Sequence, residues 1–492
     1  TDQSLLVRAG VSSITFLLFT THPTGMMHIV LCQIKQVLVI AAAVTSLLAG
    51  YSQGLAFPGG GASEAPPAKW PLLIPLLRES VPVVRKNRTV SYKTSYSGTI
   101  AVGRPAQEFR VVFDTGSGNI VLPSIDCPNE TCLEHRQYNI SKSQTAVAIN
   151  SDGSAVPDDE LCDQVTIGYG TGKITGEFVR EQVCPGVNGT CIDMSIVIAV
   201  EMSSNPFKAF TFDGIFGLSL DSLAISSEFS FFNRIGASRA PSSQFGVFLT
   251  GGEEGEESEI AFGGYNSDRV LTPLKWAPLA MKRLGYWQVS IKEVRIDGKA
   301  LEVCKDGTCR GIVDTGTSHL GVPGSELGEF VGQLSVDDFE SAPDDCRKTQ
   351  GARLEIELEG ELTLSLDPEN YMRPLSLPVG MNVGTSNGVA VLTGTGAAQQ
   401  KAVVDDTLRT CAPRIMPVNL PYPLGPKLFI LGEPVLHRYY TVYDWKEKQV
   451  GFGLSSTAAN RKALKAAGTV GDIVTLMQVT LKVTVRARVK AT

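Results

Sequence analysis

Two short stretches of this chain could supply a catalytic pair of carboxylates. Residues 112–119 read VFDTGSGN and residues 312–319 read IVDTGTSH, so each places Asp-Thr-Gly after an apolar run and before a hydroxyl residue. Two carboxylates held close together cannot both ionise cheaply, and they therefore share a proton. The ionised member can withdraw a proton from a water molecule, while the protonated member polarises the carbonyl that the water attacks. We therefore interpret Asp114 and Asp314 as a candidate dyad.

The elements around the two aspartates form a repeat with one asymmetry. Each half of the chain also carries a later apolar-apolar-Gly stretch, at 215–217 and 430–432, which suggests a duplicated scaffold. Only the first half has a hairpin pattern with Gly on both sides of its tip, at residues 165–176. Glycine at such positions favours a mobile turn.

Composition favours a folded protein with many short strands. The chain has 492 residues, of which 43% are hydrophobic and 19% charged, enough for more than one packed domain. Its 49 glycines and 27 prolines, with recurrent short β-branched and aromatic runs, favour strands and turns over long helices. The net charge of −6 is too mild to indicate a nucleic-acid partner.

The cysteines and glycosylation motifs indicate the secretory route. Several of the ten cysteines stand in close pairs whose spacing does not fit common zinc sites, so small disulfide loops are expected and no metal site. Asn-x-Ser/Thr motifs occur four times, at Asn87, Asn129, Asn139 and Asn188. The chain is therefore predicted to be a secreted glycoprotein or a resident of a lysosome- or vacuole-like compartment.

The two ends of the chain differ from its middle. Residues 1–50 are interpreted as an upstream segment and a signal peptide, or else a retained anchor, because the apolar run at 37–50 is short for a membrane span. Residues 51–90 are interpreted as a linker or prosegment that ends in a basic cluster, and strands are expected from about residue 91. Residues 456–492 form a basic extension.

Together these motifs resemble the pepsin-like, cathepsin D-like eukaryotic aspartic proteases over about residues 92–454. The resemblance implies an all-β, bilobal fold of two related β-barrel lobes, 91–275 and 276–455, with a cleft between them. It places Asp114 and Asp314 at the floor of the cleft and Tyr169, Gly170 and Thr171 on a flap over the substrate. It implies polypeptide substrates, no cofactor and a monomer.

The resemblance also assigns supporting roles. Thr115 and Thr315 would cross-link the two catalytic loops, and Ser117 and Thr317 would hydrogen-bond the outer carboxylate oxygens. Gly116 and Gly316 let the backbone turn tightly beside the carboxylates. Family disulfides would map to Cys127–Cys132, Cys304–Cys309 and Cys346–Cys411. Of the remaining cysteines, Cys184 could pair locally with Cys191, or with Cys162 across the flap hairpin.

Two departures from the family pattern stand out. Val121 occupies the position where a Trp usually steadies the flap tyrosine. Glu433 stands where Asp commonly follows Leu-Gly. Since the dyad and its hydroxyl partners are present, we predict an endopeptidase active on the acidic side and cutting between bulky apolar residues. The alternatives are a non-catalytic binding protein of the same fold, or a processing protease anchored through its N-terminal apolar segment.

Overall fold

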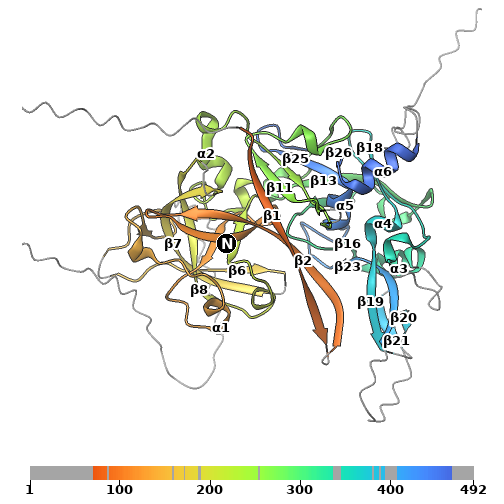
Figure 1. The fold of residues 1–492 in the computed structure, drawn as a ribbon, viewed down its shortest axis with the longest axis horizontal. Coiled ribbons are helices and arrows are strands. Elements are labelled where there is room, and N and C mark those ends of the chain that lie inside the picture. Colours follow the sequence, from red (N-terminus) through yellow and green to blue (C-terminus); the bar gives the residue numbers. More distant parts are fainter. Residues whose placement is uncertain are drawn as a thin grey trace, which may run out of the picture.

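The computed structural model describes residues 70–467, with gaps at 86–87, 158–159, 171, 187–189, 253–254, 336–344, 379–381, 387–388 and 394–406. Two lobes built largely of strands lie side by side (Figure 1), so the expected all-β, bilobal fold is confirmed. Among these residues, no helix is both long and apolar enough to cross a membrane. The apolar run at 37–50, the sequons at Asn87 and Asn188, and most of the basic extension lie outside the described residues.

The first lobe carries the elements that lead to and cover Asp114. Its elements are β1 (Leu72–Arg85), β2 (Arg88–Val102), β3 (Gln107–Asp114), β4 (Ile120–Pro123), α1 (Glu130–Leu133), β5 (Val147–Ile149), β6 (Val165–Tyr169), β7 (Gly172–Pro185), β8 (Ile192–Met202), β9 (Gly214–Gly217), α2 (Phe231–Arg239), β10 (Gln244–Phe248) and β11 (Ser258–Phe262).

The second lobe carries the elements that lead to Asp314. Its elements are β12 (Lys275–Pro278), β13 (Gln288–Ile296), β14 (Lys299–Ala300), β15 (Arg310–Val313), β16 (Leu320–Pro323), α3 (Leu327–Leu334), β17 (Leu354–Leu358), β18 (Leu362–Leu366), α4 (Pro368–Tyr371), β19 (Met372–Pro378), β20 (Asn382–Ser386), β21 (Val389–Thr393), β22 (Thr407–Pro413), β23 (Ile415–Val418), β24 (Leu428–Leu431), α5 (Glu433–Arg438), β25 (Tyr439–Asp444), β26 (Gln449–Leu454) and α6 (Ala458–Ala467).

The two lobes share one continuous sheet. Its 14 strands include β12, β25 and β26 from the second half, and β25 pairs antiparallel with β10 of the first. Eight further strands form the sheet of the second lobe, in the order β18-β17-β13-β15-β24-β16-β23, with β14 paired to β13. The relative position of the lobes is therefore fixed by backbone hydrogen bonds as well as by side-chain packing.

The repeat seen in the sequence is a repeat of strand pairing. In the first lobe β3 pairs parallel with β9, which pairs antiparallel with β4. In the second lobe β15 pairs parallel with β24, which pairs antiparallel with β16. Each Asp-Thr-Gly thus follows a central strand whose parallel neighbour is the apolar-apolar-Gly stretch of the same lobe.

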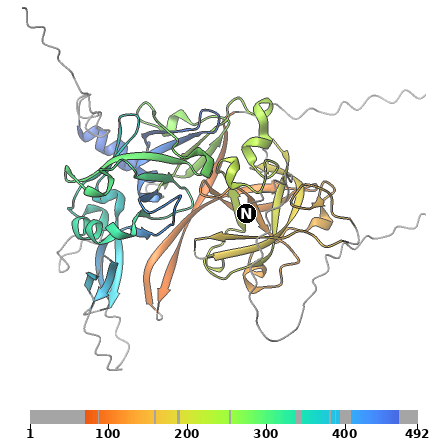
Figure 2. The ribbon, with the colours of Figure 1, turned by 180° about the vertical axis from the view of Figure 1, so that it is seen from behind.

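Strand β1 begins at Leu72, about twenty residues before the first strand expected from the sequence. It pairs with β11 and then with β2, and both views of the ribbon show β1 and β2 running between the lobes (Figures 1 and 2). Its alternate residues Ile74 and Leu76 are buried, whereas Pro75 between them is exposed. Pro75 and Pro82 interrupt the strand pattern in the sequence, because proline lacks the backbone donor that a central strand uses.

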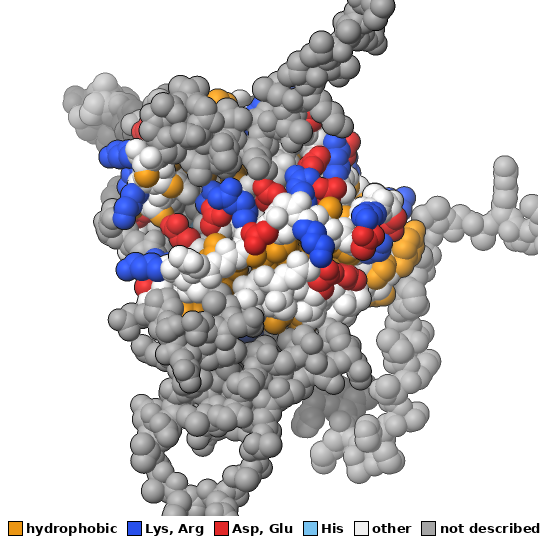
Figure 3. All heavy atoms as spheres, turned by 90° about the vertical axis from the view of Figure 1, so that its right-hand side faces the viewer, with side chains coloured by type: hydrophobic (Ala, Val, Ile, Leu, Met, Phe, Trp, Pro, Cys, Tyr) orange, Lys and Arg blue, Asp and Glu red, His pale blue; other side chains and the backbone are white. Residues whose placement is uncertain are grey.

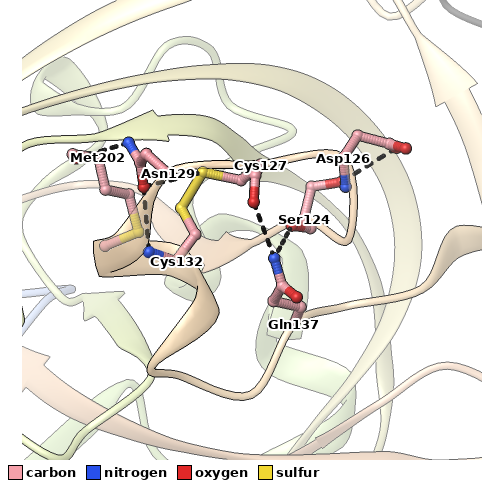
Figure 4. The surroundings of a disulfide bond; sticks show 7 residues. All are labelled: Ser124, Asp126, Cys127, Asn129, Cys132, Gln137 and Met202. Atoms are coloured by element: carbon pink, nitrogen blue, oxygen red, sulfur yellow. Dashed lines mark hydrogen bonds between the residues drawn. A yellow bond between two sulfur atoms is a disulfide. The ribbon is translucent and has the colours of Figure 1, made fainter.

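Four disulfides join the described cysteines, including the three that the resemblance implied. The fourth is Cys184–Cys191, so the alternative pairing of Cys184 with Cys162 is not formed. Around Cys127–Cys132, Asn129 caps helix α1 (Figure 4). Its Oδ1 accepts a hydrogen bond from the Cys132 amide at 3.1 Å, and its Nδ2 donates to the Met202 carbonyl at 2.8 Å. The side chain of this sequon asparagine therefore takes part in two hydrogen bonds of the folded structure.

We expect Asn129→Ala to lower the free energy of unfolding by about 1 kcal/mol, because the helix loses its capping acceptor. Asn129→Asp keeps the acceptor and loses only the donor to Met202, so it should fall between the wild type and the alanine variant. Urea denaturation of the three proteins measures the differences. Equal stability of all three would contradict this role of the cap.

Candidate active site

The two predicted aspartates meet where the central strands of the lobes end. Asp114 is the last residue of β3, and Asp314 directly follows β15. Their loops are joined by the two threonines. The Thr115 amide donates to Thr315 Oγ1 and the Thr315 amide donates to Thr115 Oγ1, both at 3.0 Å. Each hydroxyl then donates onward to the opposite strand, at 2.8 Å to Val313 and 2.6 Å to Phe113.

Each carboxylate is held by the same pair of donors in its own loop. The Gly116 amide donates to Asp114 Oδ1 at 2.9 Å and Ser117 Oγ to Oδ2 at 2.6 Å. In the second lobe the Gly316 and Thr317 donors lie 2.8 and 2.5 Å from the Asp314 oxygens. The structure therefore brings together all eight predicted residues of the two catalytic loops.

The two glycines allow the carboxylates to approach each other. A Cβ atom on Gly316 would lie 2.4 Å from Asp114 Oδ1, and one on Gly116 would lie 3.0 Å from Asp314 Oδ1. Each inner carboxylate oxygen thus faces the glycine of the opposite loop. A side chain at Gly316 would push the carboxylates apart.

The charge environment of the pair is asymmetric. Burial and the nearby charge of Asp114 raise the pKa of Asp314 well above the usual carboxyl range, although the Thr317 and Gly316 hydrogen bonds oppose this. The pair therefore holds one proton to a higher pH than an isolated carboxyl would. One retained proton on a close pair of carboxyls is what the shared-proton chemistry requires.

Tyr286 lies close to the dyad, which the sequence reasoning did not foresee. Burial and the charges of Asp314 and Asp114 raise its pKa. The next residue, Trp287, is fully buried and donates from Nε1 to the Leu218 carbonyl of the first lobe at 2.7 Å. Neither aromatic could be assigned to the site from the sequence, because their positions follow from the packing between the lobes.

The flap tyrosine is packed by aromatic and aliphatic side chains instead of being held by a hydrogen bond. Tyr169 ends β6, its ring meets that of Phe207 edge to face at 5.9 Å, and it packs on a cluster containing the buried Val121. Burial and the Asp114 charge raise the pKa of its hydroxyl, which has no hydrogen-bond partner among the described residues. Gly170 follows with a left-handed φ of 52°, and Thr171 lies outside the described residues.

Glu433 proves to be a buried link behind the Asp314 loop. Its amide donates to the Thr317 carbonyl at 3.0 Å, and its carboxylate pairs with Arg414 at 2.8 Å. Arg414 in turn donates to Thr94 Oγ1 of strand β2 at 2.9 Å. Burial opposes ionisation, but three nearby arginines, Arg414, Arg373 and Arg78, hold the pKa of Glu433 below its usual range.

The fold and the carboxylate pair define a two-lobed hydrolase whose catalytic groups come from both lobes. A family model described as eukaryotic aspartyl protease matches residues 95–455. Cathepsin E of Oryctolagus cuniculus is 30% identical over 359 residues, covering 72% of this chain and 79% of the relative. Pepsin A of Rhinolophus ferrumequinum is 30% identical over 358 residues, covering 72% and 80%. Cathepsin E of Aquarana catesbeiana is 29% identical over 73% of this chain and 78% of its own length.

The chain therefore belongs to the eukaryotic aspartyl protease family. It is an aspartic-type endopeptidase that acts on polypeptides.

We expect Thr115→Val to lower the free energy of unfolding by about 1–3 kcal/mol, because it leaves the Thr315 amide and the Val313 carbonyl without partners in a buried place. Peptidase activity should fall as well, since the loops lose part of their cross-link. Thr115→Ser keeps the hydroxyl and should retain most of both properties. A valine variant with wild-type stability and turnover would show that the cross-link is dispensable.

We expect Tyr169→Phe to leave thermal stability unchanged or slightly raised, because the hydroxyl that it removes is buried without a partner among the described residues. Tyr169→Ala should destabilise the flap, since it also removes the ring that meets Phe207. Differential scanning calorimetry separates the two effects. A marked loss of stability in the phenylalanine variant would indicate that the hydroxyl is satisfied in solution.

Proposed function

We propose that the endopeptidase works by a water molecule activated between Asp114 and Asp314. The observation that carries this proposal is the close approach of two carboxylates whose loops are joined by reciprocal threonine hydrogen bonds. Metal ions and nucleophilic side chains have no part in this scheme. The alternative of a non-catalytic binding protein receives no support from the described dyad, whose donors are all in place.

The proposed reaction has two stages. Ionised Asp114 takes a proton from the water as the water oxygen attacks the peptide carbonyl carbon, while protonated Asp314 donates a hydrogen bond to the carbonyl oxygen. The resulting tetrahedral intermediate collapses as the amide nitrogen receives a proton from the dyad, and the peptide C–N bond breaks. The Ser117 and Thr317 hydroxyls keep the outer oxygens oriented throughout.

The remaining organisation of the chain is also part of the proposal. Four disulfides indicate a secretory-pathway protein. Within that pathway we propose cleavage of a signal within residues 1–50, a prosegment that begins near residue 51, and delivery to the exterior or to an acidic lysosome-like compartment as a monomer. Because β1 pairs within the main sheet, the prosegment would end before Leu72 or leave this strand behind.

Asp314→Asn should reduce turnover by about 10²–10⁴-fold, because an amide cannot exchange the dyad proton. The wild type should be most active on the acidic side and lose activity as the pH rises through the raised pKa of Asp314, where the shared proton leaves. Rates of peptide cleavage between about pH 3 and 7 test both expectations.

The same variant gives a second readout in stability. A carboxyl whose pKa is raised by folding binds its proton more tightly in the folded state, so its contribution is present at low pH and is lost as the pH rises through the folded pKa. Asp314→Asn should therefore lose less stability than the wild type between acidic and neutral pH. Asp268→Asn, at an exposed site, is the matched control and should follow the wild type in both assays. If Asp314→Asn cleaved peptides at the wild-type rate, the dyad mechanism would be excluded.

A further inference from the structure

A small polar cavity lies away from the catalytic pair, where α4, α5 and the start of α6 come together. Its volume is about 40 Å³, and its lining includes Thr250, Arg347, Arg373, Asn370, His437 and Asn460. That is room for two or three water-sized groups, so the cavity suits a small ligand and not a peptide. Thr250, Asn370 and Asn460 are each more than nine-tenths buried.

Positive charge exceeds negative charge around this cavity. Arg78, Arg373 and Arg414 all act on the single buried carboxylate of Glu433, and Arg78 and Arg414 lie within ion-pair distance of it. Within the described part of the chain, no carboxylate lies within ion-pair distance of Arg373. Its Nη1 donates only to the Glu369 and Met372 carbonyls, at 3.1 and 2.7 Å.

The other charged groups of the lining do not cancel this excess. Arg347 is balanced by a two-point pairing with Asp345, at 2.8 and 3.0 Å. The side chain of Glu369 is exposed to solvent, where water screens its repulsion. His437 is buried next to Glu433, but burial and the surrounding arginines lower its pKa to about 3, so it adds no charge in the working range.

The N-terminal end of helix α6 adds partial positive charge to the cavity. Thr457, Ala459 and Asn460 from this end of the helix line the cavity, and the first turn of α6 has no acidic residue. The N-terminal amides of a helix carry partial positive charge and favour an anion. Basic and acidic side chains are interspersed on the face of the molecule shown in Figure 3, so the excess is a local feature of the cavity and not of that whole face.

From this combination we infer that the cavity is a binding site for a small oxyanion such as sulfate or phosphate. The Arg373 guanidinium supplies a cation with no carboxylate at ion-pair distance among the described residues, and the start of α6 supplies partial positive charge. Thr250 and Asn460 close the cavity, but their side-chain donors are already bonded to Glu256 and to the Arg438 and Ser455 carbonyls. His437 connects the site to the rest of the molecule, because its ring contacts the Tyr96 hydroxyl of β2 and the Glu433 carboxylate. The bound anion would therefore stabilise the junction of β2, α5 and α6.

The test is titration calorimetry of the full folded protein with sodium sulfate against sodium chloride at matched ionic strength. We expect a saturable isotherm with one site for the wild type, accompanied by a saturable rise in melting temperature. Arg373→Gln should abolish the isotherm, and Arg283→Gln, which removes an exposed arginine outside the cavity, should keep it. If Arg373→Gln does not fold, Arg373→Lys, which keeps the charge but loses the planar guanidinium, should weaken binding at least tenfold.

Sulfate also stabilises many proteins without binding, and that effect grows with concentration in every variant alike. A non-saturating rise in melting temperature shared by all variants, or an isotherm unaffected by the Arg373 substitutions, would overturn the inference. Inorganic phosphate at neutral pH should compete with sulfate for the site, and absence of competition would also overturn it. Because binding is read by heat, the inactive Asp314→Asn protein should bind equally well, which separates this inference from the proposed mechanism.

Discussion

The mutual repulsion of two half-buried carboxylates is the constraint on which the rest of this structure depends. Asp114 and Asp314 come from different lobes, yet each inner oxygen lies against the glycine of the opposite loop. Their charges would drive the loops apart unless something held them. The reciprocal hydrogen bonds of Thr115 and Thr315 act at the loops themselves, and the continuous 14-stranded sheet acts at a distance. Proton sharing then removes most of the remaining repulsion.

The two halves of the scaffold are alike in their strand pairing but differ in the side chains around the carboxylate pair. Both aspartates have the same set of local donors, so these hydrogen bonds alone do not decide which one keeps the proton. The first lobe contributes the β6–β7 hairpin that we predict to be the flap, with Tyr169 close enough for the Asp114 charge to act on its hydroxyl. The second lobe places Tyr286 beside the pair instead. Tyr169 and Tyr286 therefore give the two carboxylates different surroundings, although the loops that carry them are alike.

The sequence allowed prediction of those features that depend on neighbouring residues. The repeated Asp-Thr-Gly stretches marked the candidate dyad, and the close cysteine pairs marked small disulfide loops. The resemblance to a known family supplied the roles of the threonines and the individual disulfide pairings. Strand β1 could not be predicted in this manner, because its prolines at 75 and 82 look unfavourable until the exposed side of the strand is known. The site neighbours Tyr286 and Glu433 were also missed as such, since their positions follow from packing between segments that lie far apart in the chain.

Glu433, which departs from the family pattern, forms a buried ion pair with Arg414. A buried ion pair gives little net stability, because desolvation offsets most of the attraction, but removing one partner leaves a costly unpaired charge. Here the Glu433 amide holds the Thr317 carbonyl, while its carboxylate reaches Arg414 and, through it, Thr94 on β2. The Glu433–Arg414 ion pair therefore connects the Asp314 loop to strand β2, which runs between the lobes.

Val121 is the other departure from the family pattern. Its aliphatic side chain packs in the same cluster as Tyr169, and the Tyr169 hydroxyl has no hydrogen-bond partner in the described structure. The Asp314 loop is thus held by polar contacts, whereas Tyr169 is held by apolar ones.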